Sequence, residues 1–114
     1  MTSSLPSWRS LLFVPMTSER FVAKAHTRGA DAIILDLEGS ILPTHKAIAR
    51  AALAATVPRV AQAGADVVVR INRPLDLAVA DIAASVMPGV AALMLPKVMG
   101  PEHVRLLAEL VSDR

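Results

Sequence analysis

Apolar residues of this chain gather in four short runs that polar residues or prolines interrupt. The runs span Ser10–Pro15, Ala32–Leu37, Val67–Ile71 and Ala92–Leu95. Short runs rich in valine, isoleucine and leucine predict strands buried on both faces, which are typical of parallel sheets. Gly29, Gly64 and Gly89 precede the last three runs, and a glycine just after a helix supplies its left-handed cap. The pattern therefore predicts helices that end at a glycine and lead into strands.

The segments between these runs predict four helical regions. The first begins at Thr17 or Ser18, and the second begins near Thr44. Because proline removes a backbone donor, we expect a break at Pro58 or a second short helix there, ending at Gly64. The third covers Leu77–Val86. The fourth begins at Pro101, a favoured first helical position. Its expected buried residues are Val104, Leu107, Ala108 and Val111.

Strands and helices thus alternate four times, which predicts an α/β fold with parallel strands and right-handed crossovers. We expect one domain over residues 1–114, built from four βα units. Such units form either a small open sheet, as in flavodoxin-like domains, or the first half of a (β/α)8 TIM barrel, which typically needs about 250 residues. Composition and periodicity do not separate the two.

Composition narrows the class of protein. The chain has no cysteine, which excludes disulfides and zinc–thiolate sites and favours a cytoplasmic protein. Its formal charge of +2 comes from scattered residues, without a basic stripe or an aromatic platform, so we expect no nucleic-acid partner. Charged residues and prolines keep the apolar stretches shorter than the roughly 18 residues that a membrane span needs. We therefore expect no membrane partner.

Polar residues follow the predicted strands, at the end of the sheet where α/β folds bind their ligands. The second strand leads into Asp36 and Glu38, the third into Arg70 and Asn72, and the fourth into Lys97. Because side chains alternate along a strand, we expect Asp36 and Glu38 to share one face. The same argument places Arg70 and Asn72 together.

These residues allow two interpretations. Two carboxylates beside an arginine are suited to a Mg²⁺ site with an anion clamp, because Mg²⁺ prefers oxygen ligands and arginine binds carboxylates bidentately. Alternatively, Asp36 caps loop amides and Glu38 pairs with Arg70 as a structural ion pair. Arg70 closes a run of valines and needs an anionic partner, either in the protein or in a ligand. Lys97 either reaches a phosphate or carboxylate or is solvated.

Five segments carry a family resemblance. They read RSLLFVP, RFVAKA, GADAIILDLEGSILPTHKAIAR, VVVRIN and MLPKV, in this order along the chain. Together they resemble the HpcH/HpaI aldolase and citrate lyase beta-subunit family, and RSLLFVP is more similar to its acyl-CoA branch. The resemblance implies the amino-terminal half of a (β/α)8 barrel.

The resemblance also implies a function. It implies a Mg²⁺-dependent carbon–carbon lyase, or an enzyme that catalyses the reverse condensation. The implied substrate is a β-hydroxyacyl-CoA such as citryl-, malyl- or citramalyl-CoA. The family's substrate-binding arginine falls on Arg70 and its acidic motif on Asp36 and Glu38. We therefore expect catalytic roles for Glu38 and Arg70, and substrate binding by Arg70, Asn72 and Lys97. Asp36 and Glu38 would lie around the Mg²⁺ without binding it directly.

The chain departs from the family at several positions. Gly39 replaces a second acid, Met16 a glycine and Met99 a glutamate. The family's two direct Mg²⁺ ligands are expected beyond residue 114. We thus expect either the amino-terminal half of a lyase or a truncated, inactive remnant that uses its open half-barrel face for interaction. Two open strand edges and an uncovered interior favour a homo-oligomer.

Overall fold

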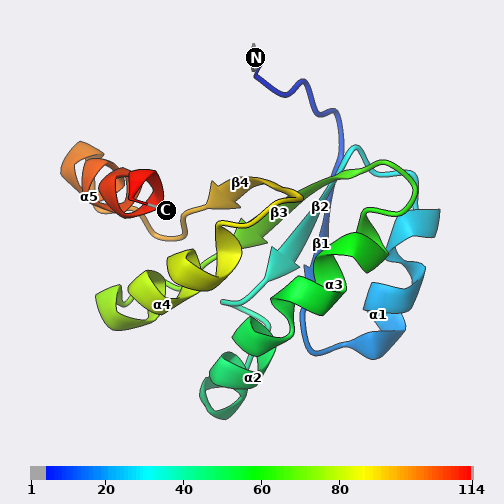
Figure 1. Ribbon diagram of the computed structural model, residues 1–114, viewed down its shortest axis with the longest axis horizontal. Helices are drawn as coiled ribbons and strands as arrows, with labels where there is room; N and C mark the ends of the chain where they lie inside the picture. The colour runs from blue at the N-terminus through cyan, green and yellow to red at the C-terminus, as the bar shows by residue number, and fades with distance from the viewer. Residues whose placement is uncertain (1–4, 114) are drawn as a thin grey trace.

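The computed structural model describes residues 5–113 and contains one sheet of four strands (Figure 1). The strands are β1 (Leu11–Pro15), β2 (Ala32–Asp36), β3 (Asp66–Arg70) and β4 (Val90–Met94). All neighbouring pairs are parallel, and the order across the sheet is β1-β2-β3-β4. The α/β prediction is confirmed. Because doubly wound sheets reverse their strand order, the consecutive order is consistent with part of a barrel.

Helices connect the strands and follow the last one. They are α1 (Glu19–Lys24), α2 (Lys46–Ala51), α3 (Leu53–Val60), α4 (Leu75–Ser85) and α5 (Pro101–Ser112), with 3-10 turns η1 (Ala25–Thr27) and η2 (Pro43–His45). Ser18 caps α1, because its hydroxyl oxygen accepts a hydrogen bond from the Phe21 amide at 3.4 Å. The predicted start of the first helix is thus confirmed.

Of the two outcomes expected at Pro58, the structure has the second short helix. Pro58 lies inside α3, which ends at Val60 rather than at Gly64, and the break lies at Ala52, between α2 and α3. Pro58 has no amide hydrogen to donate to the carbonyl of Ala54. Both residues are on the exposed side of α3. Solvent can therefore bind the carbonyl that the proline leaves free.

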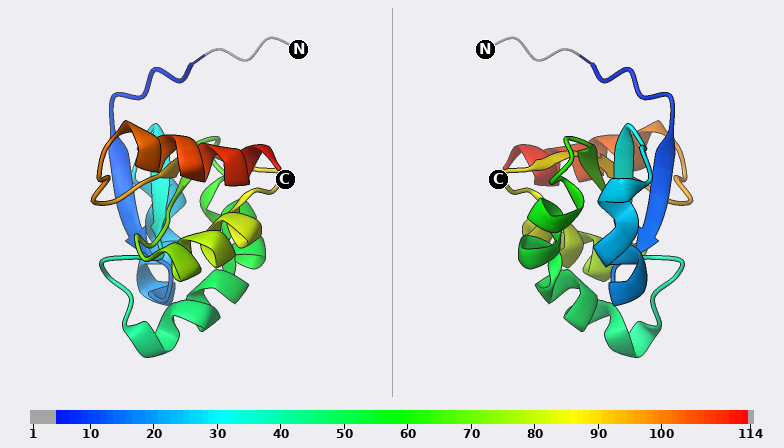
Figure 2. Two further views of the ribbon diagram at one scale, coloured as in Figure 1. Left: turned by 90° about the vertical axis from the view of Figure 1, so that its left-hand side faces the viewer. Right: turned by 90° about the vertical axis from the view of Figure 1, so that its right-hand side faces the viewer.

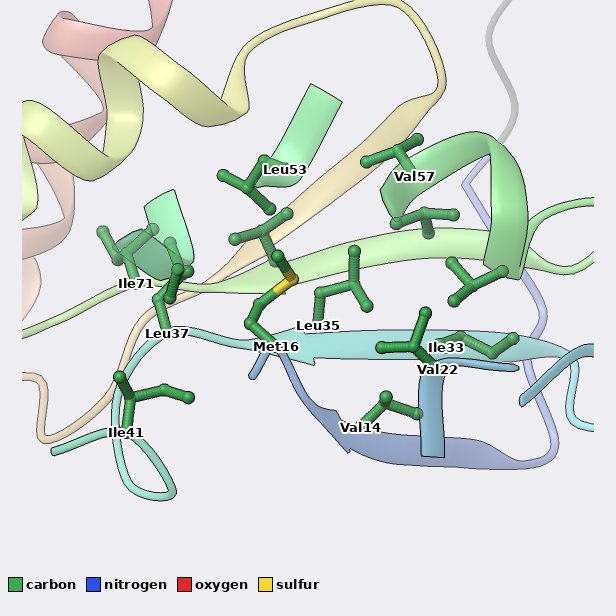
Figure 3. Close-up of a cluster of buried hydrophobic side chains, with 14 of the residues drawn as sticks. Val14, Met16, Val22, Ile33, Leu35, Leu37, Ile41, Leu53, Val57 and Ile71 are labelled. Carbon is green, nitrogen blue, oxygen red and sulfur yellow. The ribbon is translucent and has the colours of Figure 1, made fainter. Parts of the chain in front are cut away.

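One face of the sheet packs against the helices. Figure 3 shows side chains of β2, among them Ile33 and Leu35, pointing toward Leu53 and Val57 of α3. The side views in Figure 2 show α1 to α4 on the same side of β1. Burial of these aliphatic side chains, each worth about 1.5–3 kcal/mol, is the main favourable contribution to the fold.

The last helix is less buried than predicted. Of the four residues expected to be buried in α5, only Leu107 is buried, at 3% exposed. Val104, Ala108 and Val111 instead line an open groove together with Leu93 and Leu95. The pattern correctly identified the apolar face, but the described residues leave this face only partly covered.

The second face of the sheet is partly covered by the described residues. Trp8 packs against Ala32, Ile34 and Val68, and its indole Nε1 donates to Asp66 at 2.7 Å. Toward the carboxyl end, the register aligns Pro15, Asp36, Arg70 and Met94 across the four strands. This row places charged side chains at the open end of the sheet.

Within residues 5–113, none of the helices combines the length and the apolar character that crossing a membrane requires.

Candidate functional site

Asp36 and Arg70 form the centre of the carboxyl end of the sheet. They end β2 and β3, and the register makes them direct neighbours. Arg70 Nε donates to Asp36 Oδ1 and Arg70 Nη2 donates to Asp36 Oδ2, both at 2.8 Å. The guanidinium therefore binds the carboxylate side-on with two parallel hydrogen bonds, the strongest geometry for such a pair.

Asp36 also organises the loop that follows β2. Its carboxylate accepts hydrogen bonds from the amides of Glu38 and Ser40 at 2.9 and 3.0 Å, and from Ser40 Oγ at 2.7 Å. Burial raises the pKa of Asp36, but hydrogen bonds from Arg70, Ser40 and the loop amides outweigh it and hold the pKa well below its usual value. Asp36 is thus an ionised anchor that caps loop amides, as the structural interpretation of the sequence expected.

The guanidinium of Arg70 has a second edge beside the one that binds Asp36. Its guanidinium carbon lies 4.8 Å from the centroid of the Phe13 ring, a cation–π distance. Its hydrogen bonds to Asp36 raise the pKa of Arg70, so the side chain is always charged. Among residues 5–113, nothing accepts a hydrogen bond from Nη1. Arg70 lines an open hollow of about 540 Å³ with Phe13, Pro15, Phe21, Asp36, Gly39 and Ser40.

Glu38 pairs chiefly with Lys97 rather than with Arg70. Lys97 Nζ lies 2.6 Å from Glu38 Oε2, whereas Arg70 Nη2 lies 3.7 Å from Glu38 Oε1. The expected Glu38–Arg70 pair is therefore the longer contact. Lys97 has a φ of 50°, a left-handed conformation that costs free energy in a residue with a side chain. This ion pair joins the loop after β4 to the loop after β2.

Asn72 belongs to a separate, buried network. Its Nδ2 donates to the Leu37 carbonyl at 3.0 Å and to Asp81 Oδ2 at 2.7 Å, and its amide donates to Asp81 Oδ2 at 2.8 Å. Arg50 Nε donates to Asp81 Oδ1 at 2.9 Å. The network connects α2 and α4 to the ends of β2 and β3.

The shared face predicted for Arg70 and Asn72 is not observed. β3 ends at Arg70, so strand alternation does not extend to Asn72. Asn72 borders a different hollow, of about 610 Å³, beside Glu38 and Lys97. Substrate binding by Asn72 stays a prediction, and its described contacts are all to the protein.

Asp81 and Arg50 were not identified from the sequence as partners of the predicted site residues. A signal was present: Asp81 lies three residues after Ala78 and four before Ser85, on a helix face that is otherwise buried. A charged residue at such a position requires a buried partner.

Comparison with known proteins identifies the family of the chain. Residues 9–114 match the family model described as HpcH/HpaI aldolase/citrate lyase. The chain belongs to this family. The resemblance inferred from the five sequence segments is thereby confirmed.

Curated relatives in the HpcH/HpaI aldolase/citrate lyase family are lyases and a thioesterase. The chain is 35% identical to a (3S)-malyl-CoA thioesterase of Cereibacter sphaeroides, over 93% of the chain and 38% of the relative. It is 34% identical to citrate lyase subunit beta of Leuconostoc mesenteroides subsp. cremoris, over 92% and 35%. It is 33% identical to the mitochondrial citramalyl-CoA lyase of Rattus norvegicus, over 91% and 32%. The chain thus spans about a third of the length of these relatives.

The described residues of this family member do not form an open metal site. Within residues 5–113, no three side chains of His, Cys, Asp or Glu are grouped to hold a metal ion. Asp36 already accepts five hydrogen bonds, and Glu38 is paired with Lys97. As arranged, the two acids do not fit Mg²⁺ as direct ligands, because Mg²⁺ demands free oxygen atoms in octahedral geometry.

Proposed function

We propose that this chain contributes the carboxylate-binding part of the active site of a carbon–carbon lyase, or of an enzyme that catalyses the reverse condensation. The proposed substrate is a β-hydroxyacyl-CoA such as citryl-, malyl- or citramalyl-CoA. The names of the relatives support an acyl-CoA substrate for the family. Mg²⁺ belongs to the proposal as a cofactor that Asp36 and Glu38 do not bind directly.

The observation that carries the proposal is the free edge of Arg70. Asp36 and the Phe13 ring fix the guanidinium, and none of the described residues accepts a hydrogen bond from Nη1, beside an open hollow. An arginine bound side-on by one carboxylate retains its end-on edge for another, which matches the two oxygens of a ligand carboxylate. Since the pair with Asp36 is already formed, little side-chain entropy is lost when the ligand binds.

The chemistry of the substrate assigns a role to this contact. Cleavage breaks the bond between the hydroxyl-bearing carbon and the carbon next to the thioester. The hydroxyl loses its proton and becomes a carbonyl group, and the electron pair passes to the thioester as an enolate, which is then protonated. Arg70 would hold the carboxylate beside the forming carbonyl group and so orient the bond that breaks. Glu38 and Lys97 lie at the same rim and would orient the substrate.

Titration with malonate, a small dicarboxylate, tests the proposed contact in the full chain. We expect saturable shifts of the Arg70 Nε–Hε cross-peak in ¹⁵N NMR spectra of the native protein. Arg70→Lys retains the charge but not the planar pair of donors, so the affinity should fall about tenfold or more. Arg105→Lys, at an exposed site on α5, is the matched control and should bind malonate like the native chain.

Equal malonate affinity in the native and Arg70→Lys proteins would exclude Arg70 as the anion site. Shifts that are confined to exposed arginines such as Arg105 would exclude it as well.

A second candidate function is an interaction module, which the uncovered sheet face favours. Leu11 and Phe13 on this face are 43% and 49% exposed. Apolar side chains grouped in this way typically bind another protein surface, including a second copy of the chain. Sedimentation velocity distinguishes the candidates, because an interaction module that binds itself should show concentration-dependent association that Phe13→Ser weakens.

A further inference from the structure

Gly39 lies in the loop between Glu38 and Ser40, directly beside the guanidinium of Arg70. A Cβ atom at position 39 would lie 2.8 Å from Arg70 Nη2, 3.7 Å from Arg70 Cζ and 3.9 Å from Asp36 Oδ2. The first of these distances is shorter than real Cβ contacts. The backbone of Gly39 is not left-handed, unlike that of the chain's other glycines. The backbone therefore does not require a glycine here, and the close contact of an added Cβ would be with the tip of the Arg70 side chain.

The guanidinium cannot move aside without losing contacts. Its two hydrogen bonds to Asp36 require a coplanar side-on approach, and the Phe13 ring lies against the same group. Moving the guanidinium away from residue 39 would disturb the alignment of these two hydrogen bonds. Charge-assisted hydrogen bonds depend on this alignment. A side chain at position 39 thus competes with the Asp36–Arg70 pair.

We propose that Gly39 is a positioning residue, which admits the Arg70 guanidinium to its side-on pair with Asp36 and so sets the direction of its free edge. That this edge receives a ligand carboxylate rests on the proposed function. The steric role of Gly39 does not rest on it. Gly39 would thereby determine which carboxylate-bearing substrates the hollow accepts, because it also leaves room beside Ser40 on the wall of that hollow.

Gly39→Ala in the full chain tests the proposal with one added methyl group. The Arg70 Nε–Hε cross-peak, assigned by its disappearance in Arg70→Lys, is expected to be protected from solvent exchange in the native protein. In Gly39→Ala it should exchange at least about tenfold faster, because the hydrogen bond to Asp36 is misaligned. Malonate affinity should fall by a similar factor, since the free edge is displaced.

The Arg70→Lys background supplies the matched control. Lysine has no Nη2 atom, so an added methyl at position 39 meets no guanidinium. Gly39→Ala should therefore destabilise the native protein toward urea but not the Arg70→Lys protein, where a lower unfolded-state entropy favours alanine. Circular dichroism of each variant establishes that it is folded before the comparison.

An unchanged exchange rate of the Arg70 Nε–Hε group in folded Gly39→Ala would overturn the proposal. Equal effects of Gly39→Ala in the two backgrounds would overturn it too. Failure of the native chain to bind malonate would instead contradict the proposed function, because the exchange and stability comparisons do not use a ligand.

Discussion

Replacing Asp81 by alanine is expected to lower the free energy of unfolding by about 3–5 kcal/mol, a large part of the stability of a small domain. Asp81 is 1% exposed and accepts hydrogen bonds from Arg50 Nε, the Asn72 amide and Asn72 Nδ2. Its removal leaves an arginine without its partner and two buried N–H groups without acceptors. Each such loss carries a desolvation penalty that no new contact offsets.

Urea unfolding followed by the fluorescence of Trp8, the single tryptophan, measures this loss. The midpoint should fall by at least about 1 M, given typical slopes of 1–3 kcal/mol/M. Asp76→Ala is the matched control, because Asp76 is exposed in the first turn of the same helix. It should change stability by only about 0.5 kcal/mol. Similar midpoints for the two variants would show that the buried network contributes little.

Asp36→Asn is expected to cost about 3 kcal/mol at pH 7 and to change the pH dependence of stability. The neutral amide cannot accept both hydrogen bonds from Arg70, and its NH₂ group would face a donor of Arg70, Ser40 or the loop. The side-on pair and the loop cap would therefore weaken together.

The sign of the pH effect follows from the lowered pKa of Asp36. A carboxyl group whose pKa is lower in the folded than in the unfolded state adds stability at pH values above its unfolded pKa, near 4. This contribution declines as the pH falls below about 5 and protons bind the unfolded chain first. The stability difference between the native and Asp36→Asn proteins should thus be largest near pH 7 and shrink toward pH 2.

Urea midpoints measured from pH 7 to pH 2 check this expectation. Asp113→Asn, an exposed site just after α5, is the control and should follow the native profile. A difference between native and Asp36→Asn proteins that stays constant with pH would contradict a lowered pKa for Asp36.

Local sequence patterns predicted most of the fold. Short apolar runs located all four strands to within two residues, because buried strands need continuous apolar side chains. Serine and proline signals located the starts of α1 and α5, since both residues stabilise a helix terminus locally. The sequence left a break or a second short helix open at Pro58, because the cost of a proline inside a helix depends on whether solvent reaches the carbonyl of Ala54, which is a tertiary property.

The candidate site was predicted only in part. The sequence indicated that Asp36 and Arg70 lie at the same end of the sheet, and the register makes them neighbours. The partners of Glu38 and Asn72 were not predictable in this way. Lys97 reaches Glu38 through a left-handed backbone, and Asp81 reaches Asn72 from helix α4. Such contacts depend on loop geometry and helix packing, which periodicity does not encode.

The central claim is that Arg70 binds the substrate of an acyl-CoA lyase. Turnover of citramalyl-CoA is the most direct test of this claim. The chain would replace the matching segment of the rat citramalyl-CoA lyase, its 33% identical relative, and products would be separated by chromatography in the presence of Mg²⁺. We predict formation of acetyl-CoA and pyruvate, with a rate that falls about 100-fold or more in Arg70→Lys. Equal rates with arginine and lysine, or a folded hybrid that forms neither product, would contradict the account.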